Sequence, residues 1–148
     1  MHLVEEEISN MVSKKLIFKF ILISLLFWLA VNYFVPLLIT VDVIENKFVY
    51  FAIKNFAYAF LVSLLAVTYL EQMQVRKVAA WLFLPIVIFP ILFAAITFYV
   101  FIGVGAKTIL ELVVGSFTES CIYWIVAFGI FSLIQRWRKI KLNDTSIK

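Results

Sequence analysis

Four long apolar stretches dominate this 148-residue sequence. They cover approximately residues 16–41, 48–70, 78–102 and 108–137, with short connections between them. Each is near or above the ~20 residues that a helix needs to cross ~30 Å of hydrocarbon. Because hydrocarbon offers no water to the backbone, such stretches are expected to be helical, and short connections make neighbouring helices antiparallel. The sequence therefore predicts an all-α membrane protein, a bundle of four transmembrane helices.

Composition argues against a water-soluble fold. Hydrophobic residues make up 65% of the chain and charged residues 15%, whereas soluble domains average about 45–50% and about 25%. We expect a cytoplasmic segment at 1–15, a membrane domain at 16–137 and a basic cytoplasmic tail at 138–148. The first apolar run extends from Leu16 to about Val41. It is longer than the ~7–15-residue core of a signal peptide, so we expect it to be retained as the first span.

Basic residues predict the orientation, because cytoplasmic loops carry an excess of Lys and Arg. With both the N- and C-termini in the cytoplasm, ten basic residues lie on or near that side and three on or near the other. The ten are Lys14, Lys15, Lys19, Arg76, Lys77, Arg136, Arg138, Lys139, Lys141 and Lys148, and the three are Lys47, Lys54 and Lys107. Trp81 and Trp137 near the inner ends, and Tyr50 and Tyr99 near the outer ends, are typical of interfacial aromatic belts.

The fourth apolar stretch allows two interpretations. From Lys107 to Trp137 it is longer than one crossing requires, and a single long or tilted helix is the first interpretation. Alternatively, residues 106–120 form an interfacial helix on the outer surface and residues 121–137 cross alone. We favour the single helix, in which Glu119 lies at membrane depth.

Prolines are expected to shape the first and third spans. Pro36, Pro85 and Pro90 each lack a backbone donor and crowd the carbonyl four residues earlier. Kinks are therefore expected in both spans, with neighbouring groups satisfying the freed carbonyls. Proline is also simply commoner in membrane helices than in soluble ones.

Small residues recur on one face of the second span. Ala52, Ala59 and Ala66 follow at seven-residue spacing, with Ser63 beside them. Small side chains let helix backbones approach closely. The pattern predicts close packing, and its spacing fits a partner helix in the same chain or in a second copy.

Polar residues within the spans are the candidate site. Along the last span, steps of four residues place Lys107, Glu111, Gly115, Glu119 and Tyr123 on one helix face. A carboxyl group in hydrocarbon is costly, so Glu119 should face protein or a water-filled cavity. Helix rise places the polar residues of all four spans in the outer half of the bilayer. This intramembrane set comprises Glu119, Lys54, Asn55, Asn32 and Thr97.

Two interpretations of this set remain open. In the structural one, Lys54 extends outward, Asn32 and Asn55 bridge helices, and Glu119 pairs with Lys54 or stays protonated. In the functional one, the residues line an outward-facing polar cavity that binds an ion, a proton or a lipid headgroup. A Lys54–Glu119 ion pair is compatible with both.

Soluble-type catalysis finds little support. His2 is the only histidine and Cys121 the only cysteine, so no histidine-based metal site or nucleophile–histidine pair is expected. The string from Gly103 to Thr108 lacks the glycine that precedes lysine in a phosphate-binding loop and follows a span rather than a strand. We expect no enzyme activity, no cofactor and no metal.

The basic tail is expected to anchor the topology and to contact anionic lipid or a cytosolic protein partner. Its residues are Arg136, Arg138, Lys139 and Lys141. Nucleic-acid binding is not expected, because no folded reader is present.

With so little of the chain outside the spans, the protein is expected to act in the bilayer or through partners. The first hypothesis is a self-associating, non-enzymatic sensor or regulator of the envelope, of an immunity or defence type, in a bacterial inner membrane. The alternative is a small oligomeric transporter or channel for ions or protons, with Glu119 and Lys54 in an outward-facing polar cavity.

Overall fold

The computed structural model describes residues 2–38, 47–71, 73–101 and 105–145, and helices account for nearly all of them. In chain order the elements are α1 (His2–Leu38), α2 (Lys47–Tyr69), α3 (Val75–Phe83), the π-helical turn η1 (Leu84–Ile88), α4 (Phe89–Phe101) and α5 (Ala106–Thr145). Four segments are long and apolar enough to cross a membrane, namely Lys14–Leu37, Val49–Tyr69, Val75–Val100 and Lys107–Leu142. The all-helical fold with four apolar helices is thus confirmed. The predicted first connection, 42–47, is described only at Lys47, and residues 103 and 104 of the third, 103–107, also lie outside the described residues.

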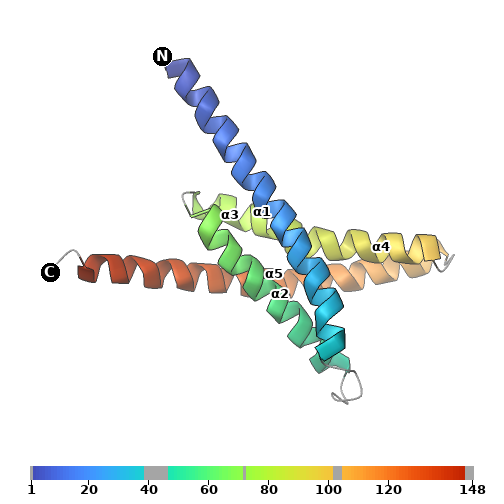
Figure 1. The fold of residues 1–148 in the computed structure, drawn as a ribbon. Coiled ribbons are helices and arrows are strands. Elements are labelled where there is room, and N and C mark those ends of the chain that lie inside the picture. Colours follow the sequence, from blue (N-terminus) through green and yellow to red (C-terminus); the bar gives the residue numbers. More distant parts are fainter. Residues whose placement is uncertain (1, 39–46, 72, 102–104, 146–148) are drawn as a thin grey trace.

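The helices form two antiparallel pairs that cross each other (Figure 1). One pair is α1 with α2, and the other is the α3–η1–α4 segment with α5. The α2 helix is central, because it packs against both α1 and α5. Residues on α2 are therefore placed where three long helices meet.

The small-residue face of α2 packs against α5 of the same chain. Ala59, Ser63 and Ala66 are fully buried, as is Ala127 on the facing helix. The Ser63 hydroxyl reaches the Ala127 carbonyl at 3.0 Å, which shows how closely the two backbones approach. Ala52 is only partly buried. The contact left open by the sequence pattern is thus intramolecular over residues 59–66.

Larger apolar side chains complete a single core between the helices. Its fully or almost fully buried members include Phe20 of α1, Val62 of α2, Leu82 of α3 and Phe131 of α5. Lipid tails are as apolar as these side chains, so their burial stabilises the bundle through close packing rather than through removal from water. The stability of this core therefore depends on how closely its side chains fit together.

Helix α5 is continuous over all 40 of its residues. At ~1.5 Å per residue it is about 60 Å long. Residues 106–120 and 121–137 belong to this one helix, which confirms the single-helix interpretation of the fourth stretch. Helix α1 is likewise continuous from His2, and Pro36 lies in its final turn.

The third span contains a π-helical turn at its prolines. Over Leu84–Ile88 the Phe89 N–H bonds to the Leu84 carbonyl, five residues back instead of four. The Pro85 carbonyl has therefore lost its α-helical donor, and its π-helical donor would be residue 90, a proline. The prolines do distort this span, and the Pro85 carbonyl is one that this geometry leaves without a backbone donor.

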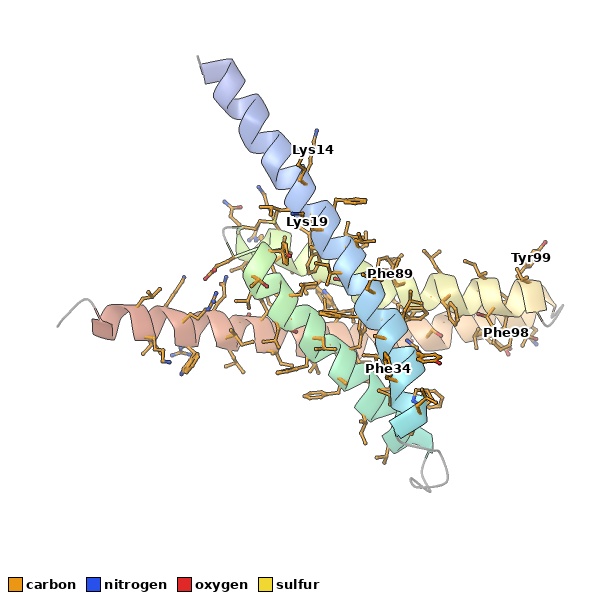
Figure 2. The ribbon with its side chains drawn as sticks, viewed as in Figure 1. Lys14, Lys19, Phe34, Phe89, Phe98 and Tyr99 are labelled. Atoms are coloured by element: carbon orange, nitrogen blue, oxygen red, sulfur yellow. The ribbon has the colours of Figure 1, made fainter. Side chains whose placement is uncertain are left out.

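Figure 2 shows how the side chains are distributed along the helices. Lys14 and Lys19 lie on the N-terminal half of α1, and Phe34 lies toward its other end. Tyr99 is 76% exposed and Trp137 59% exposed, as expected of side chains at a lipid–water boundary. Trp81 is half-buried. Tyr50 is only 7% exposed, so its side chain packs against the protein rather than projecting outward.

Candidate functional site: a polar cluster between three helices

Asn32 on α1 and Lys54 on α2 form the first half of the polar cluster. The Lys54 ammonium donates a hydrogen bond to the Asn32 Oδ1 atom at 3.0 Å. The Asn32 amide in turn donates to the Trp28 carbonyl at 2.8 Å, which orients its oxygen toward the lysine. The ammonium also lies 5.2 Å from the centre of the Phe51 ring. Lys54 is thus held between a polar acceptor and an aromatic face.

Asn55 on α2 and Glu119 on α5 form the second half. The Asn55 Nδ2 atom donates to the Glu119 Oε1 atom at 2.9 Å. Tyr123, one turn beyond Glu119, lies next to Asn55 and Glu119. Glu119 and Tyr123 therefore share a helix face, as the sequence spacing predicts, and at this level the face is turned toward α2.

Asn32, Lys54, Asn55 and Glu119 together constitute the polar cluster, and they connect α1, α2 and α5. Lys54 and Asn55 are adjacent in sequence, so the two hydrogen-bonded pairs are neighbours on α2. Glu119 acts electrostatically on Lys54, but the predicted direct ion pair between them is not formed. Each instead has an asparagine as its hydrogen-bonding partner.

The Glu119 carboxylate is exposed on the surface of the isolated chain. Its expected burial between helices is therefore wrong for a single copy, because the contact with Asn55 of α2 leaves it exposed. Counted from Ala106, Glu119 lies about 20 Å along the helix at ~1.5 Å per residue, well inside the apolar segment Lys107–Leu142. A polar group at that position needs a partner other than lipid.

Thr97, the fifth predicted member, lies on α4 and is half-buried. Among the described residues its hydroxyl makes no side-chain hydrogen bond to the other four. The structure thus brings together four of the five predicted residues in two pairs.

A second polar contact was not foreseen from the sequence. The Tyr58 hydroxyl, which is buried, donates to the Pro85 carbonyl at 3.0 Å and lies 3.4 Å from the Ser24 carbonyl. It thereby supplies the donor that the π-helical turn lacks and connects α1, α2 and η1. The sequence feature that could have indicated this contact is the spacing, since Tyr58 follows Asn55 by three residues and so lies on the same helix face.

The basic residues at the end of α5 differ in their surroundings. Arg138 forms an ion pair with Glu71, at 3.0 Å between Nη1 and Oε2. Lys141 lies over the Trp137 ring with its ammonium 4.4 Å from the ring centre. Arg136 and Lys139 are exposed and line a shallow surface cavity. Arg138 and Lys141 are thus engaged within the chain.

Three surface cavities lie at the end of the bundle where α2 ends, and none of these three is lined by the polar cluster. The polar cluster contains amide, ammonium and carboxylate groups, and Glu119 is its only carboxylate, the group that would bind a metal ion. Within the residues that the structure describes, no three His, Cys, Asp or Glu side chains are grouped so as to hold a metal ion.

No family model matches this chain, and neither a curated protein nor a solved structure matches it significantly.

Proposed function

We propose that this protein is a non-enzymatic, self-associating membrane protein that senses or regulates events in the envelope, of an immunity or defence type. In this proposal it resides in a bacterial inner membrane with both termini in the cytoplasm. The observation that carries self-association is the exposed Glu119 carboxylate within an apolar segment.

A charge at the centre of a membrane helix costs about 2.5–3.5 kcal/mol on insertion scales. The Asn55 amide offsets part of this cost by donating one hydrogen bond. The remaining acceptor capacity of the carboxylate faces outward, where a second copy would supply polar partners and exclude lipid. Exposed leucines and phenylalanines nearby need no such cover, because lipid solvates them.

Self-association is tested by the mass of the protein in a mild detergent, measured by light scattering. We expect the wild-type protein to contain two or more chains. Glu119→Ala should shift it toward one chain, whereas Glu119→Gln should retain the assembly because an amide still forms hydrogen bonds. Glu111→Ala, which removes an exposed carboxylate two turns nearer the end of the same segment, is the matched control.

A monomeric wild-type protein would reject self-association, and so would an assembly that Glu119→Ala leaves intact. The regulatory role requires a cytosolic protein partner in addition. Arg136 and Lys139, which are exposed on α5, are the proposed contacts. Replacing both by glutamine should abolish co-purification of that partner and leave the assembly intact.

The alternative function is ion or proton transport by an oligomer of this chain, with Glu119 and Lys54 along the path. It is favoured by the side-by-side pairs of donors and acceptors from three helices. Ion or proton flux into liposomes that contain the purified protein distinguishes the two. Under this alternative, Glu119→Gln abolishes flux while the assembly persists, and under the regulatory proposal the wild-type protein carries no flux.

A further inference from the structure

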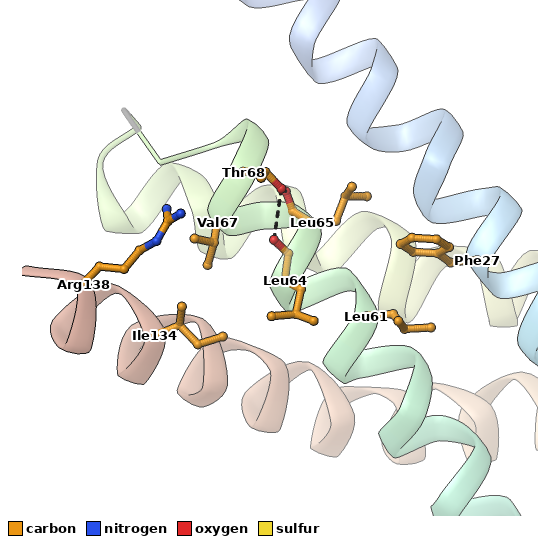
Figure 3. A pocket seen from close by; sticks show the side chains of 8 residues that line it. All are labelled: Phe27, Leu61, Leu64, Leu65, Val67, Thr68, Ile134 and Arg138. Carbon is orange, nitrogen blue, oxygen red and sulfur yellow. Dashed lines mark hydrogen bonds between the residues drawn. The ribbon is translucent and has the colours of Figure 1, made fainter. Parts of the chain in front are cut away.

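A groove between α1, α2 and α5 lies at the end of the bundle where α2 ends, and none of its lining residues belongs to the polar cluster (Figure 3). Its volume is about 450 Å³, within the ~300–1,000 Å³ usual for ligand sites. The lining is aliphatic and aromatic except for Thr68 and Arg138. Its members are Phe27, Leu61, Leu64, Leu65, Val67, Thr68, Ile134 and Arg138.

The groove has an apolar end and a cationic end. Figure 3 shows Arg138 at one end and Phe27 with Leu61 at the other. The Thr68 hydroxyl bonds to the Leu64 and Leu65 carbonyls of its own helix, at 3.1 Å and 2.9 Å. The guanidinium of Arg138 is therefore the group in this lining that can bind a charged ligand.

The direction of the groove follows the direction of the span. From Leu61 to Thr68 the lining extends about 10 Å along α2, at ~1.5 Å per residue, and α2 ends one residue later at Tyr69. Phe27 lies near the middle of the apolar segment Lys14–Leu37. The groove thus leads from the end of a span to the depth at which acyl chains pack.

A second cavity, about 490 Å³ in volume, shares Arg138 with the groove. It is lined by Glu71, Trp137, Arg138, Lys141 and Leu142. Two cations and one carboxylate leave this lining with one net positive charge. Trp137 is a residue type favoured at the headgroup level of a bilayer.

We propose that the two cavities form one binding site for an anionic phospholipid. One acyl chain lies in the groove against Leu64 and Ile134, and the phosphate lies at Arg138 and Lys141. Arginine has five N–H donors in a fork that fits a phosphate. The single bond of Nη1 to Glu71 leaves other donors of the guanidinium for the lipid. This inference requires the helices to lie in a bilayer but does not depend on the proposed regulatory function.

The experiment is native mass spectrometry of the detergent-solubilised protein with added phosphatidylglycerol or phosphatidylcholine. We expect one phosphatidylglycerol to be retained per chain, with at least tenfold preference over phosphatidylcholine. Leu64→Trp should fill the groove and abolish retention of both lipids. Leu92→Trp, on an exposed position of α4 outside the groove, is its matched control and should retain the lipid.

The charged end is tested by Arg138→Gln and Glu71→Gln, which have opposite expected effects, together with one control substitution. Arg138→Gln should remove the preference for phosphatidylglycerol, and Lys77→Gln, which makes the same change in charge at an exposed position of α3, should preserve it. Glu71→Gln should strengthen retention, because it releases a donor of Arg138 and raises the local positive charge. If the Arg138–Glu71 pair were only structural, Arg138→Gln and Glu71→Gln would both weaken lipid retention, or neither would change it.

Three results would overturn the proposal. The first is equal retention of lipid by the Leu64→Trp and Leu92→Trp variants. The second is equal binding of phosphatidylglycerol and phosphatidylcholine by the wild-type protein. The third is a wild-type protein that forms a dimer without bound lipid and that Leu64→Trp converts to a monomer. In that case a second copy of the chain, and not a lipid, would cover the groove.

Discussion

The Asn55 amide on α2 donates a 2.9 Å hydrogen bond to the Glu119 carboxylate on α5, and these residues are 64 positions apart in the sequence. This bond places the carboxylate of the last helix against the central helix of the bundle. Because Lys54 precedes Asn55, the same turn of α2 also carries the bond to Asn32 on α1. One turn of α2 thus connects three helices through polar groups.

The first prediction concerns the coupling between Asn55 and Glu119. In a double-mutant cycle with Asn55→Ala and Glu119→Ala, we expect an interaction energy of about 0.6 kcal/mol, the average for side-chain hydrogen bonds between membrane helices, and no more than about 1.7 kcal/mol. Unfolding of the protein by sodium dodecyl sulfate in mixed micelles measures it. A cycle with Glu111→Ala in place of Glu119→Ala should give no coupling, and equal coupling in the two cycles would contradict the bond.

The second prediction concerns the buried Tyr58 hydroxyl. Tyr58→Phe keeps the ring but leaves the Pro85 carbonyl without a donor. A buried polar group without a partner costs about 1–3 kcal/mol, so the free energy of unfolding should fall by an amount in this range. The same change at Tyr99, which is 76% exposed, should alter it by less than about 0.5 kcal/mol. Equal effects at the two positions would remove the role assigned to Tyr58.

Much of this fold follows from the sequence, because hydrophobic length and the absence of water determine that each span is a helix. The four helices, the continuous last helix and the close-packed face around Ala59 are all predictable. Which polar residues form hydrogen-bonded pairs is harder to predict. Two asparagines, one lysine and one glutamate in the same half of the bundle allow several pairings, and helix rotation selects Asn32 with Lys54 and Asn55 with Glu119.

The exposure of Glu119 was not predictable, because the sequence does not say how far α2 covers α5. The desolvation cost predicted burial of the carboxylate, and the isolated chain satisfies that requirement on one side only. The π-helical turn was also not predictable from the sequence. Pro85 and Pro90 predict a distortion, but the carbonyl that loses its donor depends on which hydrogen bond Phe89 makes.

The third prediction concerns the contact between α2 and α5. Ala59 is fully buried beside Ser63, whose hydroxyl reaches the Ala127 carbonyl. Ala59→Leu should therefore force the helices apart and lower the free energy of unfolding by about 1–3 kcal/mol. Ala80→Leu adds the same atoms at an exposed position and should be nearly neutral. Thermal unfolding in detergent, followed by circular dichroism, compares the two, and equal stability would contradict the observed packing.

The fourth prediction tests why Tyr58 is needed. The Pro85 carbonyl accepts no backbone hydrogen bond, because the Phe89 N–H bonds to the Leu84 carbonyl and residue 90 has no N–H. Pro90→Ala restores that N–H. If the π-helical turn persists, residue 90 donates to Pro85, and if the turn becomes α-helical, Phe89 donates to it instead. In either geometry the Pro85 carbonyl acquires a backbone donor.

Tyr58→Phe should therefore cost less in the Pro90→Ala background than in the wild-type protein, with a difference of about 1 kcal/mol. The same unfolding titration measures this difference. Pro36→Ala, in the final turn of α1, restores a backbone donor elsewhere and should leave the cost of Tyr58→Phe unchanged. Strictly additive effects of Tyr58→Phe and Pro90→Ala would mean that the hydroxyl stabilises the bundle through Ser24, its other neighbour, rather than by completing the hydrogen bonds of the π-helical turn.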